Sequence, residues 1–335
     1  MELLSKLENR SLKIISRKIN ARIEKGDENF LISAIATPEI NQVSDIIFIR
    51  NENFLKKLVN IKSKTCLIPN SLKNEVSQFE NILISDKPDY SFALLTKIFA
   101  INNDFNKYIS HNFNFVNTPV IGPGTKLSEN ISIGKNVQIG CNCVIGESVF
   151  IGDNTVIDHN VTIYDNVIIG KNNHISSSSV IGSEGFGFSK HEGNWNHICH
   201  LGSVVLGDNV YIGSNTCIDK GTISNTVIES NVIIDNLVHI AHNVHIGDGS
   251  AIAAKVGIAG STVIGRNCLI GGMTGIFGHL KIADNVVITP KSNVYRDIKE
   301  SGRYSSLFPL ISHLSWKKIS IIISKIDKII KYTKK

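Results

Sequence analysis

The sequence has few aromatic residues and few charges. Among its 335 residues, aromatic side chains make up 7% and charged side chains 19%, while hydrophobic residues reach 42%. This composition is typical of a folded chain rather than a disordered one. The formal net charge of +6 is a mild excess that favours acidic partners. Because no basic stripe interleaved with aromatic residues is present, we expect no nucleic-acid partner.

Signals for export, membrane insertion and cysteine chemistry are also missing. The charged N-terminus, MELLSKLENRSLK, lacks the apolar core of a secretory signal. No apolar run reaches the ~18 residues that a membrane span needs. The six cysteines include no CxxC pair, and we do not expect a cysteine nucleophile. We therefore expect a cytoplasmic protein with free thiols and no transmembrane segment.

What the sequence does have is an aliphatic residue at every sixth position. The series runs from Ile121 to Ile181, resumes at Leu206, and after a four-residue insertion continues from Ile228 to Ile288. This spacing is the hexapeptide repeat of a parallel β-helix. Three hexads close one triangular coil. The aliphatic residue and the residue two before it are expected inside the coil, and the residue between them outside.

Three segments depart from this period. Residues 1–105 are typical of a mixed α/β domain, with strands predicted at DIIF, TCLIP and NILISD and a helix at YSFALLTKIFA, and 106–118 would be a linker. The β-helix would cover 119–296, interrupted at 183–200 by an aromatic loop with either a functional or a passive role. Within the helical extension 297–335, residues 313–335 carry isoleucines on one helix face beside seven lysines. We interpret this helix as packing within an oligomer, with a basic surface for an acidic partner as a second interpretation.

The stretch NLVHIAHNVHIGDG carries three histidines spaced three residues apart. His239 and His245 each precede an aliphatic residue, so they are expected to point outward from two different faces. His242 falls near the corner between those faces. Side chains spread in this way do not converge on one ion at ~2.1 Å. We therefore predict no metal site within the chain, with a metal shared between subunits as the alternative.

On such a coil, His242 shares an edge with residues further along the chain. Gly260 lies one coil away, His279 follows the glycine two coils away, and Asp235 lies one corner back in the same coil. A histidine beside a carboxylate is suited to act as a general base. A glycine lets a ligand approach its backbone N–H, which can stabilise an oxyanion. The column favours acyl transfer to an amine or a hydroxyl, and a surface histidine without a role is the alternative.

The sequence around these residues resembles the UDP-3-O-(3-hydroxyacyl)glucosamine N-acyltransferase family of lipid A biosynthesis. The resemblance is carried by IIDNLVHIAHNVHIGDGSAIAAKVGIAGSTVIGRNCLIGG, GIFGHLKIADNV, IGSEGFGFSKHEGNWNHICHLG, GRYSSLFPL and ATPEINQVSDIIFIRNENFLKKL. It implies a mainly β fold, in which a left-handed parallel β-helix carries an N-terminal α/β nucleotide-binding domain and a C-terminal helical tail. It also implies a homotrimer with active sites in the clefts between the β-helices.

The same resemblance implies a role for each residue of the column. His242 would be the general base that takes a proton from the glucosamine amine. Asp235 would orient and polarise His242, and Gly260 would offer its N–H to the tetrahedral oxyanion. His279 would help to hold phosphate groups of the donor or the nucleotide.

In the N-terminal domain, the resemblance implies a uridine site. Phe48 and Phe54 would flank the base, with Asn51 near it. Phe54 stands where family members often have tyrosine, which removes a hydroxyl but keeps a stacking surface. This difference leaves the exact sugar substrate and the acyl-chain length open.

The implied partners follow from the implied reaction. The donor would be a 3-hydroxyacyl thioester on acyl carrier protein, a strongly acidic partner for which the basic C-terminal helix is a suitable surface. The acceptor would be UDP-3-O-acylglucosamine, and neither a metal nor a redox cofactor is expected. Peripheral proximity to a membrane is compatible with such substrates. The alternative is an N-acyl- or acetyltransferase acting on a different UDP-amino sugar.

Overall fold

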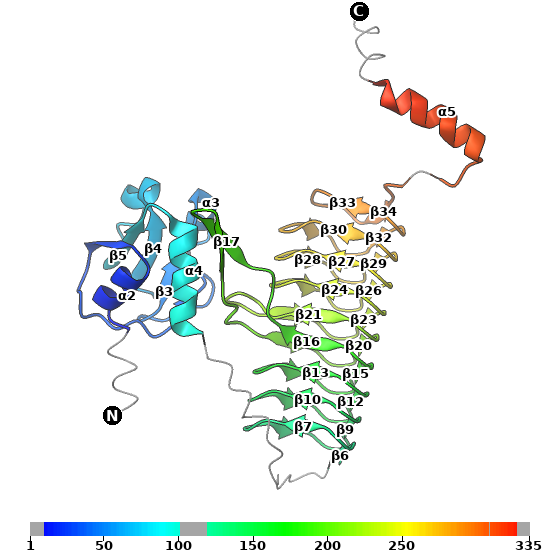
Figure 1. The fold of residues 1–335 in the computed structure, drawn as a ribbon, viewed down its shortest axis with the longest axis horizontal. Helices are drawn as coiled ribbons and strands as arrows, with labels where there is room; N and C mark the ends of the chain where they lie inside the picture. The colour runs from blue at the N-terminus through cyan, green and yellow to red at the C-terminus, as the bar shows by residue number, and fades with distance from the viewer. Residues whose placement is uncertain (1–9, 101–118, 308, 327–335) are drawn as a thin grey trace, which may run out of the picture.

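The computed structural model describes residues 10–100, 119–307 and 309–326, which form an N-terminal domain, a long β-helix and a C-terminal helix (Figure 1). The mainly β fold predicted from the six-residue period is confirmed. The predicted linker lies outside the described residues.

The N-terminal domain is a five-stranded sheet with the order β1-β5-β4-β3-β2, in which only β1 runs antiparallel to its neighbour. Its elements are α2 (Leu12–Lys18), β1 (Arg22–Lys25), β2 (Ile35–Ala36), β3 (Ile46–Phe48), α3 (Glu52–Leu55), β4 (Thr65–Pro69), the 3-10 helix η1 (Asn70–Glu75), β5 (Asn81–Ser85) and α4 (Pro88–Phe99). The central strands β4 and β5 are buried almost throughout, as is typical of parallel strands covered on both faces. Strands β3, β4 and β5 and helix α4 coincide with the segments predicted from the sequence.

Each coil of the β-helix contributes one short strand to each of three parallel sheets, which we call faces 1, 2 and 3. Face 1 consists of β7 (Lys126–Leu127), β10 (Val144–Ile145), β13 (Thr162–Ile163), β16 (Val180–Ser183), β21 (Cys217–Asp219), β24 (His239–Ile240), β27 (Gly257–Ile258), β30 (Gly275–Ile276) and β33 (Asn293–Val294). Face 2 consists of β8 (Ser132–Ile133), β11 (Phe150–Ile151), β14 (Ile168–Ile169), β19 (Val204–Leu206), β22 (Thr226–Ile228), β25 (His245–Ile246), β28 (Val263–Ile264) and β31 (Lys281–Ile282). Face 3 consists of β6 (Val120–Ile121), β9 (Gln138–Ile139), β12 (Val156–Ile157), β15 (His174–Ile175), β20 (Tyr211–Ile212), β23 (Ile233–Ile234), β26 (Ala251–Ile252), β29 (Leu269–Ile270), β32 (Val286–Ile288) and β34 (Gly302–Tyr304).

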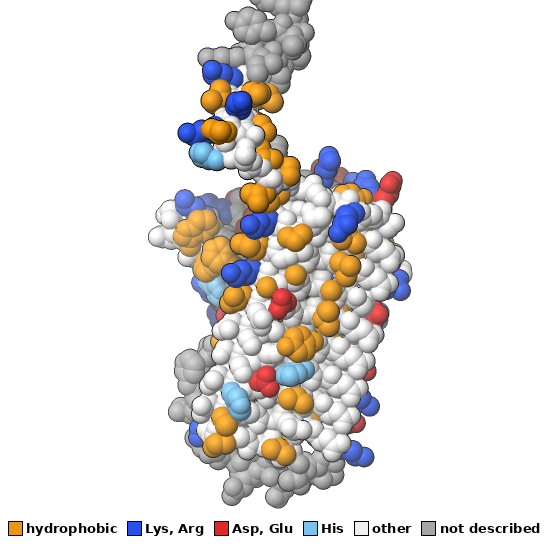
Figure 2. All heavy atoms as spheres, turned by 90° about the vertical axis from the view of Figure 1, so that its right-hand side faces the viewer, with side chains coloured by type: hydrophobic (Ala, Val, Ile, Leu, Met, Phe, Trp, Pro, Cys, Tyr) orange, Lys and Arg blue, Asp and Glu red, His pale blue; other side chains and the backbone are white. Residues whose placement is uncertain are grey.

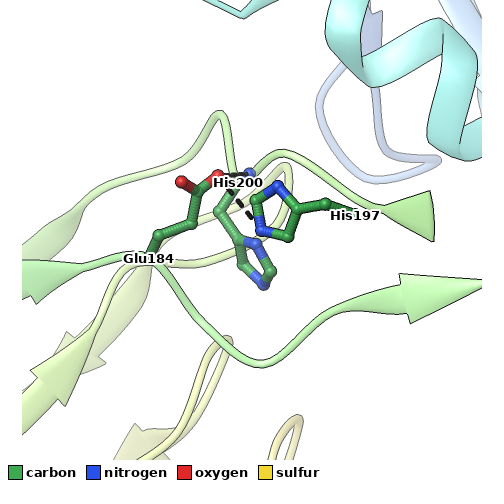
Figure 3. Close-up of side chains that lie close together, drawn as sticks. All are labelled: Glu184, His197 and His200. Carbon is green, nitrogen blue, oxygen red and sulfur yellow. Dashed lines mark hydrogen bonds and ion pairs between the residues drawn. The ribbon is translucent and has the colours of Figure 1, made fainter. Parts of the chain in front are cut away.

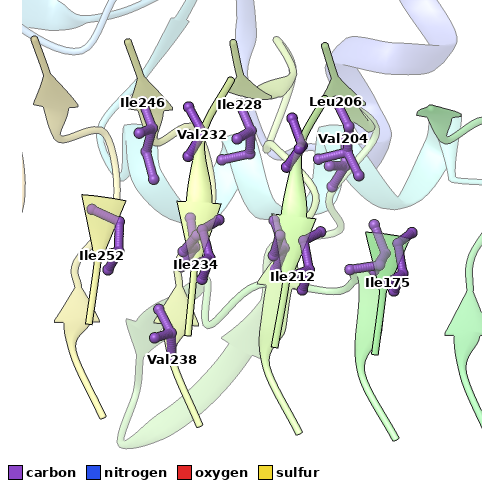
Figure 4. Packing of buried hydrophobic residues seen from close by; sticks show 14 of the residues in the cluster. Ile175, Val204, Leu206, Ile212, Ile228, Val232, Ile234, Val238, Ile246 and Ile252 are labelled. Carbon is purple, nitrogen blue, oxygen red and sulfur yellow. The ribbon is translucent and has the colours of Figure 1, made fainter. Parts of the chain in front are cut away.

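The interior of the β-helix is filled by rows of aliphatic side chains (Figure 4). Ile212 and Ile234 lie in one row and are fully buried, and Val232 and Val238, each two residues before a repeat isoleucine, pack beside them. The residue between each such pair, as at Ile233, points outward. The inside and outside positions predicted from the hexad are therefore confirmed.

The corners of the coil depend on a left-handed backbone conformation at the third residue after each aliphatic residue. Asparagine holds this position at most corners, with φ between 55° and 61° at Asn136, Asn142, Asn154, Asn160, Asn166, Asn172, Asn209, Asn215, Asn231, Asn243, Asn267 and Asn285. Asparagine tolerates this region better than most residues because its short side chain can hydrogen-bond locally. The frequent asparagines before each strand are thus a structural requirement of the turn.

Both breaks in the six-residue period fall on one edge of the triangle. We call the edge from face 1 to face 2 the first edge, that from face 2 to face 3 the second edge, and that from face 3 to face 1 the third edge. Between β16 and β19 the chain leaves the first edge and forms the antiparallel hairpin of β17 (Phe188–His191) and β18 (Asn194–His197). On the next coil, 220–225 form a shorter loop at the same edge, between β21 and β22. His242 follows β24 on the coil after that.

The hairpin connects this edge to the N-terminal domain (Figure 1). The rings of Tyr90 in α4 and His191 in β17 stack with their centroids 4.0 Å apart. The backbone N–H of Cys199 donates a hydrogen bond to Oγ1 of Thr96 at 3.1 Å. The N-terminal domain is therefore held beside the first edge, where the site residues lie.

The C-terminal helix α5 (His313–Ser324) extends away from the β-helix (Figure 1). Its side chains are exposed or half-buried, including those of Ile322 and Ile323. Ile329 and Ile330, which were predicted on the same apolar face, lie outside the described residues. Across the described parts of the chain, no helix is both long enough and apolar enough to cross a membrane.

Candidate active site

A cavity of about 1160 Å³ lies between the N-terminal domain, the hairpin and the first edge of the β-helix. The β-helix contributes His242, Ser261 and His279 to its lining, from three successive coils. The N-terminal domain contributes Phe48 and Phe54. Residues predicted from two distant parts of the sequence are thus brought to one cavity.

The orientation of the His242 imidazole is set by its neighbours. Its Nδ1 lies 3.0 Å from Oδ1 of Asn243 and 3.4 Å from Oγ1 of Thr222. The amide of Asn243 is itself fixed, because its Nδ2 donates to the carbonyl oxygen of Ser224 at 2.9 Å. An amide oxygen can only accept a hydrogen bond, so Nδ1 of His242 carries the proton and Nε2 keeps a free lone pair. This tautomer is the one that a general base requires.

Gly260 lies directly against this imidazole. A Cβ atom at Gly260 would lie 2.7 Å from both Nε2 and Cε1 of His242, so only glycine allows the ring to pack here. Backbone hydrogen bonds tie the successive coils together: Ser261 N–H donates to the carbonyl of His242, and His279 N–H donates to that of Gly260, both at 2.9 Å. The structure therefore brings His242, Gly260 and His279 into one column.

Asp235 does not join this column within the chain. It follows β23 on face 3, at the third edge, where its Oδ1 accepts from the backbone N–H of Asn236 at 2.7 Å. There it lines a separate groove with Ile233 and Leu269. The predicted contact with His242 is not formed, because one corner back in a coil means a different edge of the triangle. A catalytic role for Asp235 stays a prediction.

The neighbours that His242 does have were missed in the sequence. Thr222 and Ser224 belong to the four-residue insertion, which was noted there only as a break in the period. Asn243 lies in the segment that carries the family resemblance, but it was not singled out as a site residue. The signal that could have identified them is the position of the insertion, since it falls one coil before His242 on the same edge.

The residues predicted to bind uridine are Phe48, Asn51 and Phe54. Phe48 stacks on Phe92 with ring centroids 4.5 Å apart and planes 14° apart, and the ammonium of Lys57 lies 5.1 Å from the ring centroid of Phe54. Both predicted rings line the cavity, but Asn51 is not among its described lining residues. Asn51 instead caps the N-terminus of α3, where its side chain accepts a backbone N–H at 3.1 Å.

Comparisons with known proteins show the family to which this chain is related. Curated relatives named UDP-3-O-acylglucosamine N-acyltransferase include one from Hahella chejuensis, 37% identical over 94% of this chain and 91% of its own length. Another, from Vesicomyosocius okutanii, is 46% identical over 95% of both chains. The chain belongs to this N-acyltransferase family. A relative of the same name from Herminiimonas arsenicoxydans aligns over a shorter region, 42% of this chain and 40% of its own, at 34% identity.

Family models and a solved structure describe the β-helix. Residues 108–233 match the model of the GMPPB C-terminal domain, 225–260 that of the bacterial transferase hexapeptide, and 261–289 that of the hexapeptide repeat of succinyl-transferase. The crystal structure of UDP-N-acetylglucosamine O-acyltransferase from Moraxella catarrhalis is similar, with a TM-score of 0.50 and 27% identity over 56% of this chain and 71% of that chain. The β-helix is therefore the shared scaffold.

In this member of the N-acyltransferase family, three side chains cluster where the hairpin leaves the first edge (Figure 3). Glu184, His197 and His200 each place one atom that could bind a metal ion within 4.8 Å of the others. Glu184 Oε1 accepts from the backbone N–H of His200 at 2.8 Å and lies 3.8 Å from Nε2 of His197. Nδ1 of His200 lies 3.0 Å from the carbonyl oxygen of Ile198, so this nitrogen donates and cannot bind a cation. We interpret the cluster as an anchor for the hairpin.

His200 also supports the candidate base. Its ring packs edge-on against that of His242, with centroids 5.1 Å apart. The side chain of His200 is 2% exposed, and burial, assisted by the nearby His242, lowers the pKa of His200 to about 3, so its imidazole is neutral. A Cβ at Gly185 or Gly187 would lie 2.7 Å from the His200 ring, which explains the glycines of the SEGFG segment. His200 was not predicted from the sequence.

Proposed function

We propose that this protein transfers a 3-hydroxyacyl chain from acyl carrier protein to the 2-amino group of UDP-3-O-(3-hydroxyacyl)glucosamine. The observation that carries the proposal is the shared cavity, whose lining includes His242, Phe48 and Phe54. A sugar nucleotide bound there would have its uracil between aromatic side chains and its amine at the base. The name of the family gives the same reaction class.

The chemistry follows from the positions of these groups. As the amine nitrogen attacks the thioester carbonyl, Nε2 of His242 removes the amine proton. The carbonyl oxygen becomes an oxyanion, which the Gly260 N–H stabilises. Collapse of this intermediate breaks the C–S bond, and the leaving thiolate takes the proton from the His242 imidazolium. We assign His279, which lines the same cavity, to phosphate groups of the nucleotide or donor.

The proposed assembly is a homotrimer in which face 3 packs against a second copy. Figure 2 shows this side of the molecule, along which apolar side chains gather. Ile233 and Leu269 on face 3 are 55% and 50% exposed, and an apolar groove lies beside them. Exposed apolar surfaces of this kind mark interaction sites. We propose that α5, with exposed Ile322, packs in the same assembly and that its lysines meet the acidic carrier protein.

The decisive experiment is an assay of the full chain with UDP-3-O-(3-hydroxyacyl)glucosamine and 3-hydroxyacyl carrier protein, read by product mass. We expect His242→Ala to lower turnover by ~10²-fold or more. His239→Ala and His245→Ala are matched controls, because both side chains point outward from the faces and neither lines the cavity. Near-normal turnover by His242→Ala would contradict the mechanism. A preference for acetyl-CoA or for another UDP-amino sugar would replace the proposed substrates with the alternative.

A further inference from the structure

At many corners of the β-helix, one backbone N–H donates a hydrogen bond to a side chain on the next coil. We call such an amide closed, and one without this bond open. The N–H of the second residue after the aliphatic position donates to this side chain at 2.7–3.0 Å. The donor and acceptor pairs are Lys135–Asp153, Cys141–His159, Glu147–Asp165, Lys171–Asp208, Asp208–Ser230, Ser214–Asn236 and Arg266–Asp284. Carboxylate, imidazole, hydroxyl and amide acceptors all serve, so the position requires only an accepting side chain.

Gly260 occupies this donor position on the first edge, and the residue that stacks on it is Gly278. The register of β27 and β30, in which Ile258 pairs with Ile276, fixes that stacking. Gly278 has no side chain to accept a hydrogen bond, and within the described residues nothing else accepts from the Gly260 N–H. A Cβ atom at Gly278 would lie 3.0 Å from the carbonyl oxygen and 3.8 Å from the nitrogen of Gly260. The amide beside His242 is therefore left open.

We infer that Gly278 is a positioning residue, which keeps the Gly260 N–H free to stabilise the oxyanion of the acyl-transfer intermediate. The inference rests on the proposed function, since it concerns the same site. A side chain at this position, as on Ser230 or Asp284, would accept from the amide before the reaction begins. The developing oxyanion would then compete with a bond that the protein already makes, and the preorganised donor would be lost.

The test is a matched pair of variants that differ by one oxygen atom. Gly278→Ser supplies an acceptor in the geometry in which Ser230 closes the Asp208 amide. Gly278→Ala adds the same Cβ without the acceptor. We expect Gly278→Ser to lower kcat by about 10²-fold, as loss of one oxyanion donor does, with little change in KM, and Gly278→Ala to lower it by less than ~10-fold. Equal losses in the two variants would show an effect of bulk and overturn the inference.

Amide hydrogen exchange gives a second readout that does not depend on activity. In Gly278→Ser, exchange at the Gly260 amide should slow by roughly 3- to 10-fold, the effect of one added hydrogen bond, and in Gly278→Ala it should not. Gly272→Ser is the control for the readout, because Gly272 stacks on Ala254 as Gly278 does on Gly260. This variant should slow exchange at the Ala254 amide. Unchanged exchange at Gly260 in Gly278→Ser overturns the inference. A wild-type chain that exchanges as expected but transfers no acyl group overturns the proposed function instead.

Discussion

The first and second edges of the β-helix have the same repeat but use it differently. On the second edge, asparagine side chains form a ladder along the axis, with hydrogen bonds of 2.9–3.3 Å that connect Asn136, Asn154, Asn172, Asn209, Asn231 and Asp248. Side chains also close several amides on that edge, such as those of Lys135, Lys171 and Arg266. The first edge instead carries both interruptions, His242 and the glycine pair.

This difference teaches how a repetitive scaffold acquires a site. Backbone geometry is nearly the same at the uninterrupted corners of both edges, with φ close to 60° at both Asn209 and Asn243. What changes is whether the next coil supplies a side chain that satisfies the polar groups of the corner. A regular, closed edge stabilises the stack, and an edge left open can bind a ligand on a rigid support.

The largest expected effect comes from adding a side-chain atom at Gly260, beside His242 on the first edge. Gly260→Ala would place a Cβ 2.7 Å from Nε2 of His242 and displace the imidazole. We expect kcat to fall by ~10²-fold or more, since both the base and the oxyanion donor are disturbed. Gly257→Ala is a matched control three residues earlier, where an added Cβ meets nothing within 4 Å. Steady-state kinetics measure kcat for both variants. An equal loss of kcat in Gly260→Ala and Gly257→Ala would contradict the assigned geometry.

A smaller loss of activity is expected from replacing an asparagine that occupies the same corner position on both edges, Asn243 on the first and Asn209 on the second. Asn243→Ala removes the acceptor that fixes the His242 tautomer. A hydrogen bond to a group that becomes charged is worth about 1.5–3 kcal/mol, so kcat should fall ~10-fold or more. Asn209→Ala makes the same change in the asparagine ladder. Both variants should lose about 1–2 kcal/mol of stability, because alanine is strained in the left-handed region.

Kinetics and unfolding midpoints of this pair separate the two roles. The comparison of edges predicts that both variants lose stability but only Asn243→Ala loses turnover. Asn243→Asp, which keeps an accepting oxygen at the same position, should recover most of the activity. If Asn209→Ala and Asn243→Ala lost activity equally, the asparagine would be structural at both edges.

The six-residue period was enough to predict the β-helix and the column of His242, Gly260 and His279, because a strict repeat converts sequence distance into height along one axis. It could not predict that Thr222 and His200 contact His242, because Thr222 lies in the insertion and His200 follows a hairpin whose path no period describes. Asp235 shows the limit of the method. It is close to His242 in the sequence and was expected beside it, but it lies on another edge of the coil. Long-range contacts of irregular segments depend on packing that a repeat does not encode.

At neutral pH the last effect is too small to measure, and it appears only as the pH falls. The first edge is backed by His200, whose pKa is lowered from 6.5 to about 3 by burial. As the pH falls below 6.5, the unfolded chain gains a proton that the folded chain does not, so stability falls as pH falls. The loss is about 1.4 kcal/mol per pH unit, or about 2 kcal/mol at pH 5 relative to pH 7. His200→Gln should remove this part of the pH dependence.

Denaturant unfolding of wild type and His200→Gln between pH 7 and pH 4 measures that difference directly. The gap in unfolding free energy between the two proteins should change in favour of the variant throughout this range, because the folded protein takes up the proton only near pH 3. His174→Gln on face 3 is the control, because that side chain is 45% exposed and lies on another face of the β-helix. Parallel pH profiles for wild type and His200→Gln would mean that His200 is protonated in the folded state, and a neutral ring against His242 would then no longer describe this edge.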